Sequence, residues 1–437
     1  MEWDKSIDKT DIPAAIAPII RGLCINTLGY PWVVMYDPEM EEILSEALIV
    51  DIEPALTETD TLHEESMVKV FREAYTAWEF DRAPAGVDAA MQTTRVRKGP
   101  SCVVVKRKDT LEACYWIDQN LDAVKQRIAE KNTSLLKEKA PKDQSVHKER
   151  ILAFSATQRV DVVRNKVALI SGGICRSSGV GEVLARSLAR SGALVFIADY
   201  DLAETQRLAE QINAEEKRTA AVPLSVQVAD EESVRHLFKT IVKTTGGLDI
   251  CISNGELLTA ESVLDQSLKD FQAVTDINYT GFFLMLKYGG QVFRRQHRTA
   301  PQWKTDIIQI NAKCGLVGSQ IQSANAGSKF GALGLVSSAA LELVAYNIKV
   351  NAICPGNLFD HPLWSDAEQG FFVRSFKRVQ APGIKSPAEL RAHYEAAIPM
   401  KRACTGDDVV RALYYLIEQA YETGQAIPVT GGEVMLH

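Results

Sequence analysis

The stretch Val167-Ala-Leu-Ile-Ser-Gly-Gly-Ile-Cys-Arg-Ser-Ser-Gly-Val-Gly181 decides the fold of the second part of the chain. A short apolar strand leads through a turn into an amphipathic helix that begins near Glu182. The turn holds four glycines: Gly172, Gly173, Gly179 and Gly181. Such a turn lets the backbone approach a pyrophosphate and points the helix N-terminus at its charge. The same glycines can instead make only a tight turn that lets the helix pack on the sheet.

Beyond this stretch, short apolar segments alternate with amphipathic helices as far as the C-terminus. The expected strands are 166–170, 194–198, 222–227, 249–252, 306–310, 348–353 and 426–429. Helical spacing of three and four separates them, as in Val234, Leu237 and Ile241. This alternation predicts an α/β fold with a doubly wound, parallel, Rossmann-type sheet of seven strands over residues 163–437.

The first 130 residues predict a smaller α/β domain of uncertain origin. Residues 101–105 read as a strand, and Asp109-Thr-Leu-Glu112 resembles a capping box that opens a long helix. The apolar face expected for that helix is Leu111, Cys114, Ile117, Leu121, Val124 and Ile128. The lysine- and glutamate-rich segment 131–162 then predicts a charged helical linker.

Composition excludes several classes of partner. The 437 residues carry a formal net charge of -7, with a pI of about 5.7, which favours neither nucleic acid nor an anionic membrane as partner. The apolar stretch 12–35 is broken by Arg21, two glycines and three prolines, which argues against a membrane span. The eight cysteines stand singly without zinc-ligand spacing, so no metal site is expected. With a charged N-terminus that does not resemble a secretory signal, these features predict a cytoplasmic protein.

Asp199 ends the second expected strand of the Rossmann-type sheet. An acidic side chain at this place can accept hydrogen bonds from the adenosine ribose and repel a 2′-phosphate, which favours NAD over NADP. Aspartate at a strand end is also a common turn or cap residue. Both interpretations stay open on the sequence.

Residues 163–437 resemble the short-chain dehydrogenase/reductase family, and within it the sorbitol-6-phosphate dehydrogenase lineage. The segments that carry the resemblance are Ile307-Ile-Gln-Ile-Asn311, Lys329-Phe-Gly331, Pro355-Gly-Asn-Leu358, Pro399-Met-Lys-Arg402 and Val429-Thr-Gly-Gly432. The family works with an Asn-Ser-Tyr-Lys tetrad, in which the tyrosine is the general acid/base. The resemblance places the asparagine at Asn278 and, at Lys329, the lysine that in the family binds the nicotinamide ribose. It places Ala312 where the serine stands and Asn325 where the tyrosine stands.

The two substitutions remove the groups that handle the proton and the reacting oxygen. A carboxamide orients a carbonyl but does not exchange its proton near neutral pH. General acid/base catalysis is worth about 10²–10⁴ in rate. Hydroxyl groups at Tyr279, Ser323 and Ser328 are the alternative donors, although none stands at the required helical position.

Further departures concern the cofactor. The glycine turn is three residues longer than the family pattern and includes Arg176. The family's Asn-Asn-Ala-Gly turn reads Ser253-Asn-Gly-Glu256, which keeps Asn254 but places a carboxylate where glycine lets the backbone come close. Gln227 replaces the aspartate that meets the adenine ring, while Pro355-Gly356, which flanks the nicotinamide in the family, is intact. The resemblance therefore implies that NAD is a possible cofactor whose binding is weakened.

Three functional hypotheses follow. The leading one is a catalytically degenerate relative that acts as a binding or assembly subunit. An alternative is an active NAD-dependent oxidoreductase on a sugar alcohol or sugar phosphate, whose phosphate Lys401 and Arg402 would bind unless they only make surface salt bridges. A third makes the N-terminal domain the active part. The helix of Lys329 and the end 429–437 match the family's assembly surface, so a homo-oligomer, tetramer or dimer, is expected.

Overall fold

The structure is a computed structural model. It describes residues 12–28, 33–36, 48–51, 68–74, 102–107, 110–118, 121–126, 162–173, 179–259, 261–359 and 386–436. The predicted linker 131–162, except for its last residue, lies outside the described residues, and so does Arg176.

A parallel seven-stranded sheet forms the centre of the second part of the chain, as the sequence predicts. Its order is β11-β10-β9-β8-β5-β6-β7. The strands are β5 (Val167–Ser171), β6 (Leu194–Asp199), β7 (Ala221–Ser225), β8 (Ile250–Ser253), β9 (Thr305–Ile310), β10 (Ile348–Pro355) and β11 (Ala426–Val429). The chain order reverses between β5 and β8, and at such a switch point ligands bind beyond the carboxyl ends of the strands.

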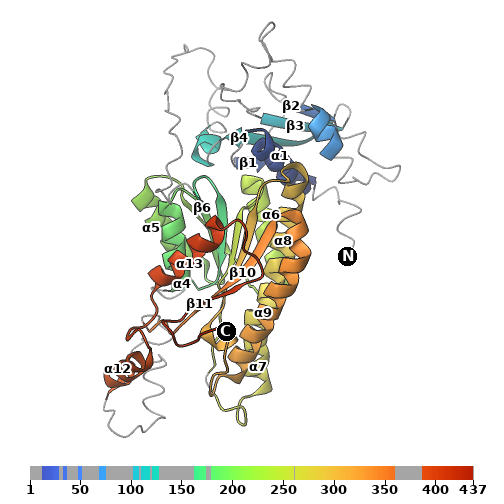
Figure 1. Cartoon of the computed structure of the whole chain (residues 1–437). Helices are drawn as coiled ribbons and strands as arrows, with labels where there is room; N and C mark the ends of the chain where they lie inside the picture. The colour runs from blue at the N-terminus through green and yellow to red at the C-terminus, as the bar shows by residue number, and fades with distance from the viewer. Residues whose placement is uncertain are drawn as a thin grey trace.

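Helices cover both faces of this sheet (Figure 1). One face carries α4 (Val180–Arg190), α5 (Leu202–Glu216) and α13 (Gly406–Glu418), and the other carries α6 (Glu231–Thr245), α8 (Gly281–Thr299) and α9 (Ser323–Leu343). Alternate residues of β5 enter the two cores, Ala168 and Ile170 on the first face and Val167 and Leu169 on the second. Because both faces are covered, β5 is an unbroken apolar run.

Shorter elements complete this part. They are α7 (Leu268–Thr275), the π-helical turn η5 (Asp276–Thr280), the 3-10 turns η6 (Lys313–Gly315) and η7 (Val344–Tyr346), and α12 (Pro387–Ala397). By length and composition alone, Ser323–Tyr346 could cross a membrane. The same helix packs against β10 and buries Lys329, so it serves here as a layer of the fold.

The N-terminal module, by which we mean the described residues from 12 to 126, has a sheet of its own. The order β1-β4-β3-β2 joins β1 (Val33–Tyr36), β4 (Thr110–Asp118), β3 (Cys102–Arg107) and β2 (Leu48–Asp51). It is accompanied by α1 (Ile12–Leu28) and by helices over 68–74 and 121–126. Only β2 and β3 pair in parallel.

The expected long helix from Asp109 is wrong for its first half, because Thr110–Asp118 is strand β4. Only two residues separate β3 from β4, so the chain folds back and pairs antiparallel, with Val103 opposite Tyr115. Tyr115 is buried in the apolar core, and tertiary pairing and packing of this kind override a local capping signal. The helix begins only at residue 121, where Leu121 and Val124 are buried as predicted. The expected strand at 101–105 is confirmed as β3.

The N-terminal module and the Rossmann-type part share one apolar core. Ile16, Ile19 and Ile20 of α1 are buried, and α1 packs against α6 and α8. Thr299 Oγ1 of α8 donates a hydrogen bond to the Ile19 carbonyl oxygen at 3.0 Å. Figure 1 shows this module beside the amino-terminal end of the seven-stranded sheet, with the label of α1 near the end of α8. The two parts therefore contact each other away from the carboxyl ends of the strands.

Candidate functional site

A cleft of about 910 Å³ lies at the carboxyl ends of the strands on both sides of the switch point. It falls within the roughly 300–1,000 Å³ that is usual for small-molecule sites. Predicted site residues that line it are Gly172, Gly173, Asp199, Gln227, Asn254, Glu256, Ala312, Asn325, Pro355 and Gly356. The structure thus brings together residues that are far apart in the sequence.

The glycine turn needs glycine at two positions. Gly172 and Gly173 have φ of 79° and 70°, in the region that favours glycine. A Cβ at Gly173 would lie 2.0 Å from Asn254 Nδ2, and one at Gly172 would lie 2.3 Å from the Cα of Gly255. Asn254 Nδ2 donates a hydrogen bond to the Gly172 carbonyl oxygen at 2.9 Å. The segment after β8 is therefore pressed against the glycine turn.

The other two glycines lie at the start of α4. Gly179 is the N-cap residue, without a side-chain cap, and a Cβ at Gly181 would lie 2.9 Å from the carbonyl oxygens of Gly172 and Gly173. Gly181 thus has a packing role, which was the alternative interpretation of the motif. The helix N-terminus still faces this end of the cleft, since Val180 is among the lining residues.

Asp199 ends β6 and is 3% exposed. Its Oδ1 accepts a hydrogen bond from the Tyr200 main-chain N–H at 2.8 Å, which is the turn role considered above. The residue also lines the cleft, so its position suits the ribose role as well. Gln227, which stands where the family has the aspartate that meets the adenine ring, also lines the cleft.

Asn278 lies buried in η5 and is held by its surroundings. Its Oδ1 accepts a hydrogen bond from the Leu257 N–H at 2.8 Å. Its Nδ2 lies 3.0 Å from the Leu257 carbonyl oxygen, 3.0 Å from Asn325 Oδ1 and 3.2 Å from Ser328 Oγ. Asn278 therefore bridges the segment after β8 to the first turn of α9.

Asn325, at the tyrosine position, is 3% exposed and takes part in the same arrangement. Its Oδ1 accepts from Asn278, and its Nδ2 donates to Cys314 Sγ at 3.4 Å. Burial, followed by the nearby Glu256 carboxylate, raises the pKa of the Cys314 thiol to about 11, so the thiol stays protonated at neutral pH. Ala312, at the serine position, is extended and carries no polar side-chain atom. The tyrosine position thus holds an amide that is already engaged by two neighbours.

Lys329 is buried in α9, and its charge is met from within the chain. Its Nζ lies 3.8 Å from Glu256 Oε1 and 3.3 Å from the Ile310 carbonyl oxygen. The Lys329 side chain is 2% exposed and that of Glu256 is 31% exposed. Glu256 therefore stands between the lysine and the cleft, which the sequence did not reveal beyond the expectation of crowding.

The three alternative hydroxyl donors are directed elsewhere. Ser323 Oγ donates to Gln266 Oε1 at 3.2 Å, and Ser328 Oγ donates to the Asn325 carbonyl oxygen at 2.8 Å. The Tyr279 ring lies against Gly331, where a Cβ would be 3.0 Å from the ring. None of the three is among the residues that line the cleft.

The far side of the cleft contains a charged pair that the sequence reasoning missed. Lys313 Nζ lies 2.5 Å from Glu433 Oε1, beside Pro355 and Gly356. Glu433 Oε2 is buried and has no hydrogen-bond partner among the described residues. Tyr394 of α12 also lines this side. No local motif marks these residues, because only the fold brings the C-terminal segment and α12 to the cleft.

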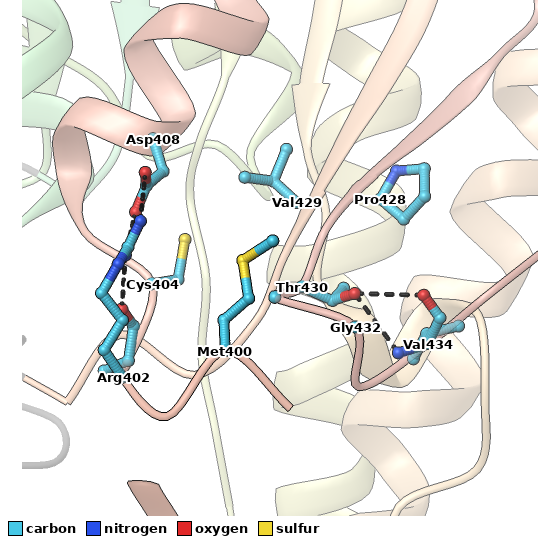
Figure 2. A pocket seen from close by; sticks show the side chains of 11 residues that line it. Met400, Arg402, Cys404, Asp408, Pro428, Val429, Thr430, Gly432 and Val434 are labelled. Atoms are coloured by element: carbon cyan, nitrogen blue, oxygen red, sulfur yellow. Dashed lines mark hydrogen bonds and ion pairs between the residues drawn. The ribbon is translucent and has the colours of Figure 1, made fainter. Parts of the chain in front are cut away.

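A second, smaller cavity of about 330 Å³ lies between the start of α13 and the turn after β11 (Figure 2). Arg402, a candidate for binding a sugar phosphate, lines it and pairs in two places with Asp408, at 2.6 and 2.9 Å. Lys401 Nζ donates to the Ala396 carbonyl oxygen at 2.7 Å. Asp408 also completes the capping box of α13 with Thr405, and the Arg402 guanidinium beside it holds the pKa of that carboxyl below its usual range. Arg402 therefore makes the surface salt bridge that was its alternative interpretation.

Fold and cleft together define a dehydrogenase-type Rossmann protein, and comparison with known proteins narrows the class. The family model for short chain dehydrogenases matches residues 166–421, so the chain belongs to the short-chain dehydrogenase family. It is 32% identical over 273 residues to sorbitol-6-phosphate 2-dehydrogenase of Escherichia coli, covering 62% of this chain and 99% of that enzyme. It is 29% identical to galactitol 2-dehydrogenase of Agrobacterium fabrum, covering 62% of this chain and 99% of that enzyme.

A solved structure gives the same result. The crystal structure of sorbitol-6-phosphate 2-dehydrogenase from Erwinia amylovora matches with a TM-score of 0.56 and 32% identity, over 62% of this chain and all of that one. The predicted resemblance to the family and to this lineage is confirmed. The matches to these three proteins leave more than a third of this chain uncovered.

Family members are typically NAD(P)-dependent, and the cleft fits the two halves of a dinucleotide differently. The adenosine half finds the glycine turn, Asp199 and Gln227 in the cleft lining. At the nicotinamide half, Lys329 is paired with Glu256, and amide and methyl side chains stand where the reaction needs hydroxyls. The residues present fit the adenosine half, whereas at the nicotinamide half Pro355 and Gly356 are retained but the hydroxyl groups of the family are missing.

Proposed function

We propose that this protein is a catalytically degenerate member of the sorbitol-6-phosphate dehydrogenase lineage, acting as a binding or assembly subunit. The observation that supports this is Asn325, whose amide is engaged by Asn278 and Cys314 in place of a proton donor. Loss of a general acid/base costs about 10²–10⁴ in rate, and loss of an oxyanion donor about 10²–10³. Although such terms are not additive, the smaller alone leaves a very slow enzyme.

The same proposal includes self-assembly through α8, α9 and the C-terminal segment, as dimer or tetramer. In support, large apolar side chains of these helices and of the turn that follows α9 are exposed: Phe283 (46%), Phe330 (46%), Leu341 (81%) and Val344 (51%). Helix α9 is apolar on most of its surface, and such a helix is usually buried in an interface or core. Light scattering coupled to gel filtration tests it, and a monomer at micromolar concentration contradicts it.

We place this subunit in the cytoplasm. In support, the cysteines at 24, 251, 314, 354 and 404 are free thiols, as in a reducing compartment.

A second candidate is an NAD-dependent oxidoreductase on a sugar alcohol or sugar phosphate. It is favoured by the volume of the cleft and by the retention of Asn278, Lys329 and Asp199. The relatives are named as enzymes for such substrates. In this case a donor other than residue 325 must move the proton.

The experiment compares NAD reduction with a panel of polyols and polyol phosphates in the wild type and in the variant Ala312→Ser/Asn325→Tyr/Glu256→Gly. We expect the wild type to reduce NAD no faster than a sample without protein, and the variant to be faster by about 10²-fold or more. Lys329→Ala in the variant background is the control and removes the gain. Wild-type turnover that Lys329→Ala abolishes contradicts degeneracy and supports the second candidate.

A further inference from the structure

The segment after β8 connects the glycine turn to Lys329. Asn254 and Gly255 press against Gly172 and Gly173, and the next residue, Glu256, extends its carboxylate to within 3.8 Å of Lys329 Nζ. The carboxylate therefore lies between the turn, where a dinucleotide's phosphates approach the backbone, and the lysine that would meet its second ribose. The chain supplies its own anion at this point.

The rest of the cleft gives an added anion little compensation. Among the described lining residues, the charged ones are the carboxylates of Asp199, Glu256 and Glu433 and the ammonium of Lys313. Lys313 is paired with Glu433, and Lys329 behind the lining is paired with Glu256. The N-terminus of α4 attracts anions, but the three carboxylates outnumber the two ammonium groups, so the cleft keeps a net negative charge that disfavours a phosphate.

The geometry points to an uncharged nucleoside of the adenosine type as the ligand of this cleft, with Glu256 rejecting its phosphorylated forms. The Glu256 carboxylate replaces the ribose hydroxyls as the partner of Lys329. The glycine turn, Asp199 and Gln227 remain for a base and one ribose. This inference rests on the proposed function, since a subunit without turnover needs no dinucleotide.

Calorimetric titration of the full-length protein with adenosine, AMP, ADP and NAD tests it. We expect adenosine to bind about tenfold tighter than ADP or NAD, because the net negative charge of the cleft disfavours their phosphates. Glu256→Gln keeps the shape, removes the charge and narrows this ratio toward one. Asp199→Ala weakens every ligand.

Glu418→Gln is the matched control, because Glu418 is exposed on α13 outside the cleft lining and the substitution makes the same change of charge. It leaves the ratio unchanged. ADP or NAD binding to the wild type as tightly as adenosine overturns the inference, as does an unchanged ratio in Glu256→Gln or no adenosine binding at millimolar concentration. The proposed function fails by a different result, namely turnover of NAD with a polyol.

Discussion

Strand β8 carries an ion pair beyond each of its ends, and the two pairs differ in almost every physical respect. Before the strand, Asp249 meets Arg21 of α1 in two hydrogen bonds of 3.0 and 2.7 Å, and both side chains are 0% exposed. After the strand, Glu256 meets Lys329 in a single contact of 3.8 Å, with the carboxylate 31% exposed. The first pair joins the N-terminal module to the dehydrogenase fold, and the second lies in the cleft.

The difference shows that a fully buried charge needs several hydrogen-bond donors around it, whereas a partly exposed charge does not. Asp249 also accepts hydrogen bonds from the Val167 N–H at 2.7 Å and from Trp303 Nε1 at 2.9 Å. Burial raises the pKa of Asp249, but the Arg21 guanidinium and the Val167 N–H outweigh burial, so the pKa lies below its ordinary value. Within the described part of the chain, Glu256 contacts no donor other than Lys329, and its side chain is partly exposed to water. The Arg21–Asp249 pair is fully buried and joins two parts of the fold, whereas the Glu256–Lys329 pair is long and partly exposed in the cleft.

The largest effect is expected when the N-terminal module is removed. A chain of residues 163–437 loses Arg21 and exposes the surface that Ile16, Ile19 and Ile20 cover. Breaking a buried pair alone costs about 3–5 kcal/mol, a large part of the ~5–15 kcal/mol that stabilises a typical protein. We expect this fragment to elute as aggregate and to show no cooperative thermal unfolding. A soluble, cooperatively folding fragment would instead support two independently folding domains.

The substitution Arg21→Ala isolates the contribution of the Arg21–Asp249 ion pair to stability. We expect the free energy of unfolding in urea to fall by about 3–5 kcal/mol, because Asp249 is left buried and unpaired. The matched control is Arg235→Ala, which breaks the surface pair with Glu232 and costs at most about 1 kcal/mol. Equal losses in the two variants contradict the structural role.

The Arg21–Asp249 pair also predicts how the stability of the protein depends on pH. Because the folded pKa of Asp249 lies below the unfolded value of about 3.9, its stabilisation is fully present above that value. It is lost as the pH falls through the folded pKa. Urea midpoints measured between pH 6 and pH 3 should therefore fall more steeply for the wild type than for Arg21→Ala. Parallel curves would show that the pair does not carry this dependence.

Most of the sheet and of the cleft lining followed from the sequence, since each strand is a short, largely apolar segment between helical patterns and the glycine turn follows the first of them. The Arg21–Asp249 ion pair could not be predicted from the sequence. Arg21 was visible only as an interruption of an apolar stretch, which signals a buried partner but not which of 56 acidic residues supplies it. The strand β4 was missed because pairing with β3 outweighed a local capping signal. The contact of Glu256 with Lys329 depends on a side-chain direction that spacing does not encode.

The smallest expected effect concerns the Glu256–Lys329 pair and is measured as the pKa of the Cys314 thiol. Burial, followed by the Glu256 carboxylate, raises the pKa of this thiol to about 11, and burial raises that of Cys354 to about 12. In Glu256→Gln the Cys314 pKa should fall, because the second cause is removed, while that of Cys354 stays in place. Alkylation by iodoacetamide across pH 8–10, followed by peptide mass spectrometry, measures both thiols in one sample. Since Glu256 is 31% exposed and its contact with Lys329 is long, at 3.8 Å, the free energy of unfolding should fall by less than in Arg21→Ala. A loss of stability as large as that of Arg21→Ala, or an unchanged pKa of Cys314, would contradict this view. Glu256 would then be a structural charge like Asp249.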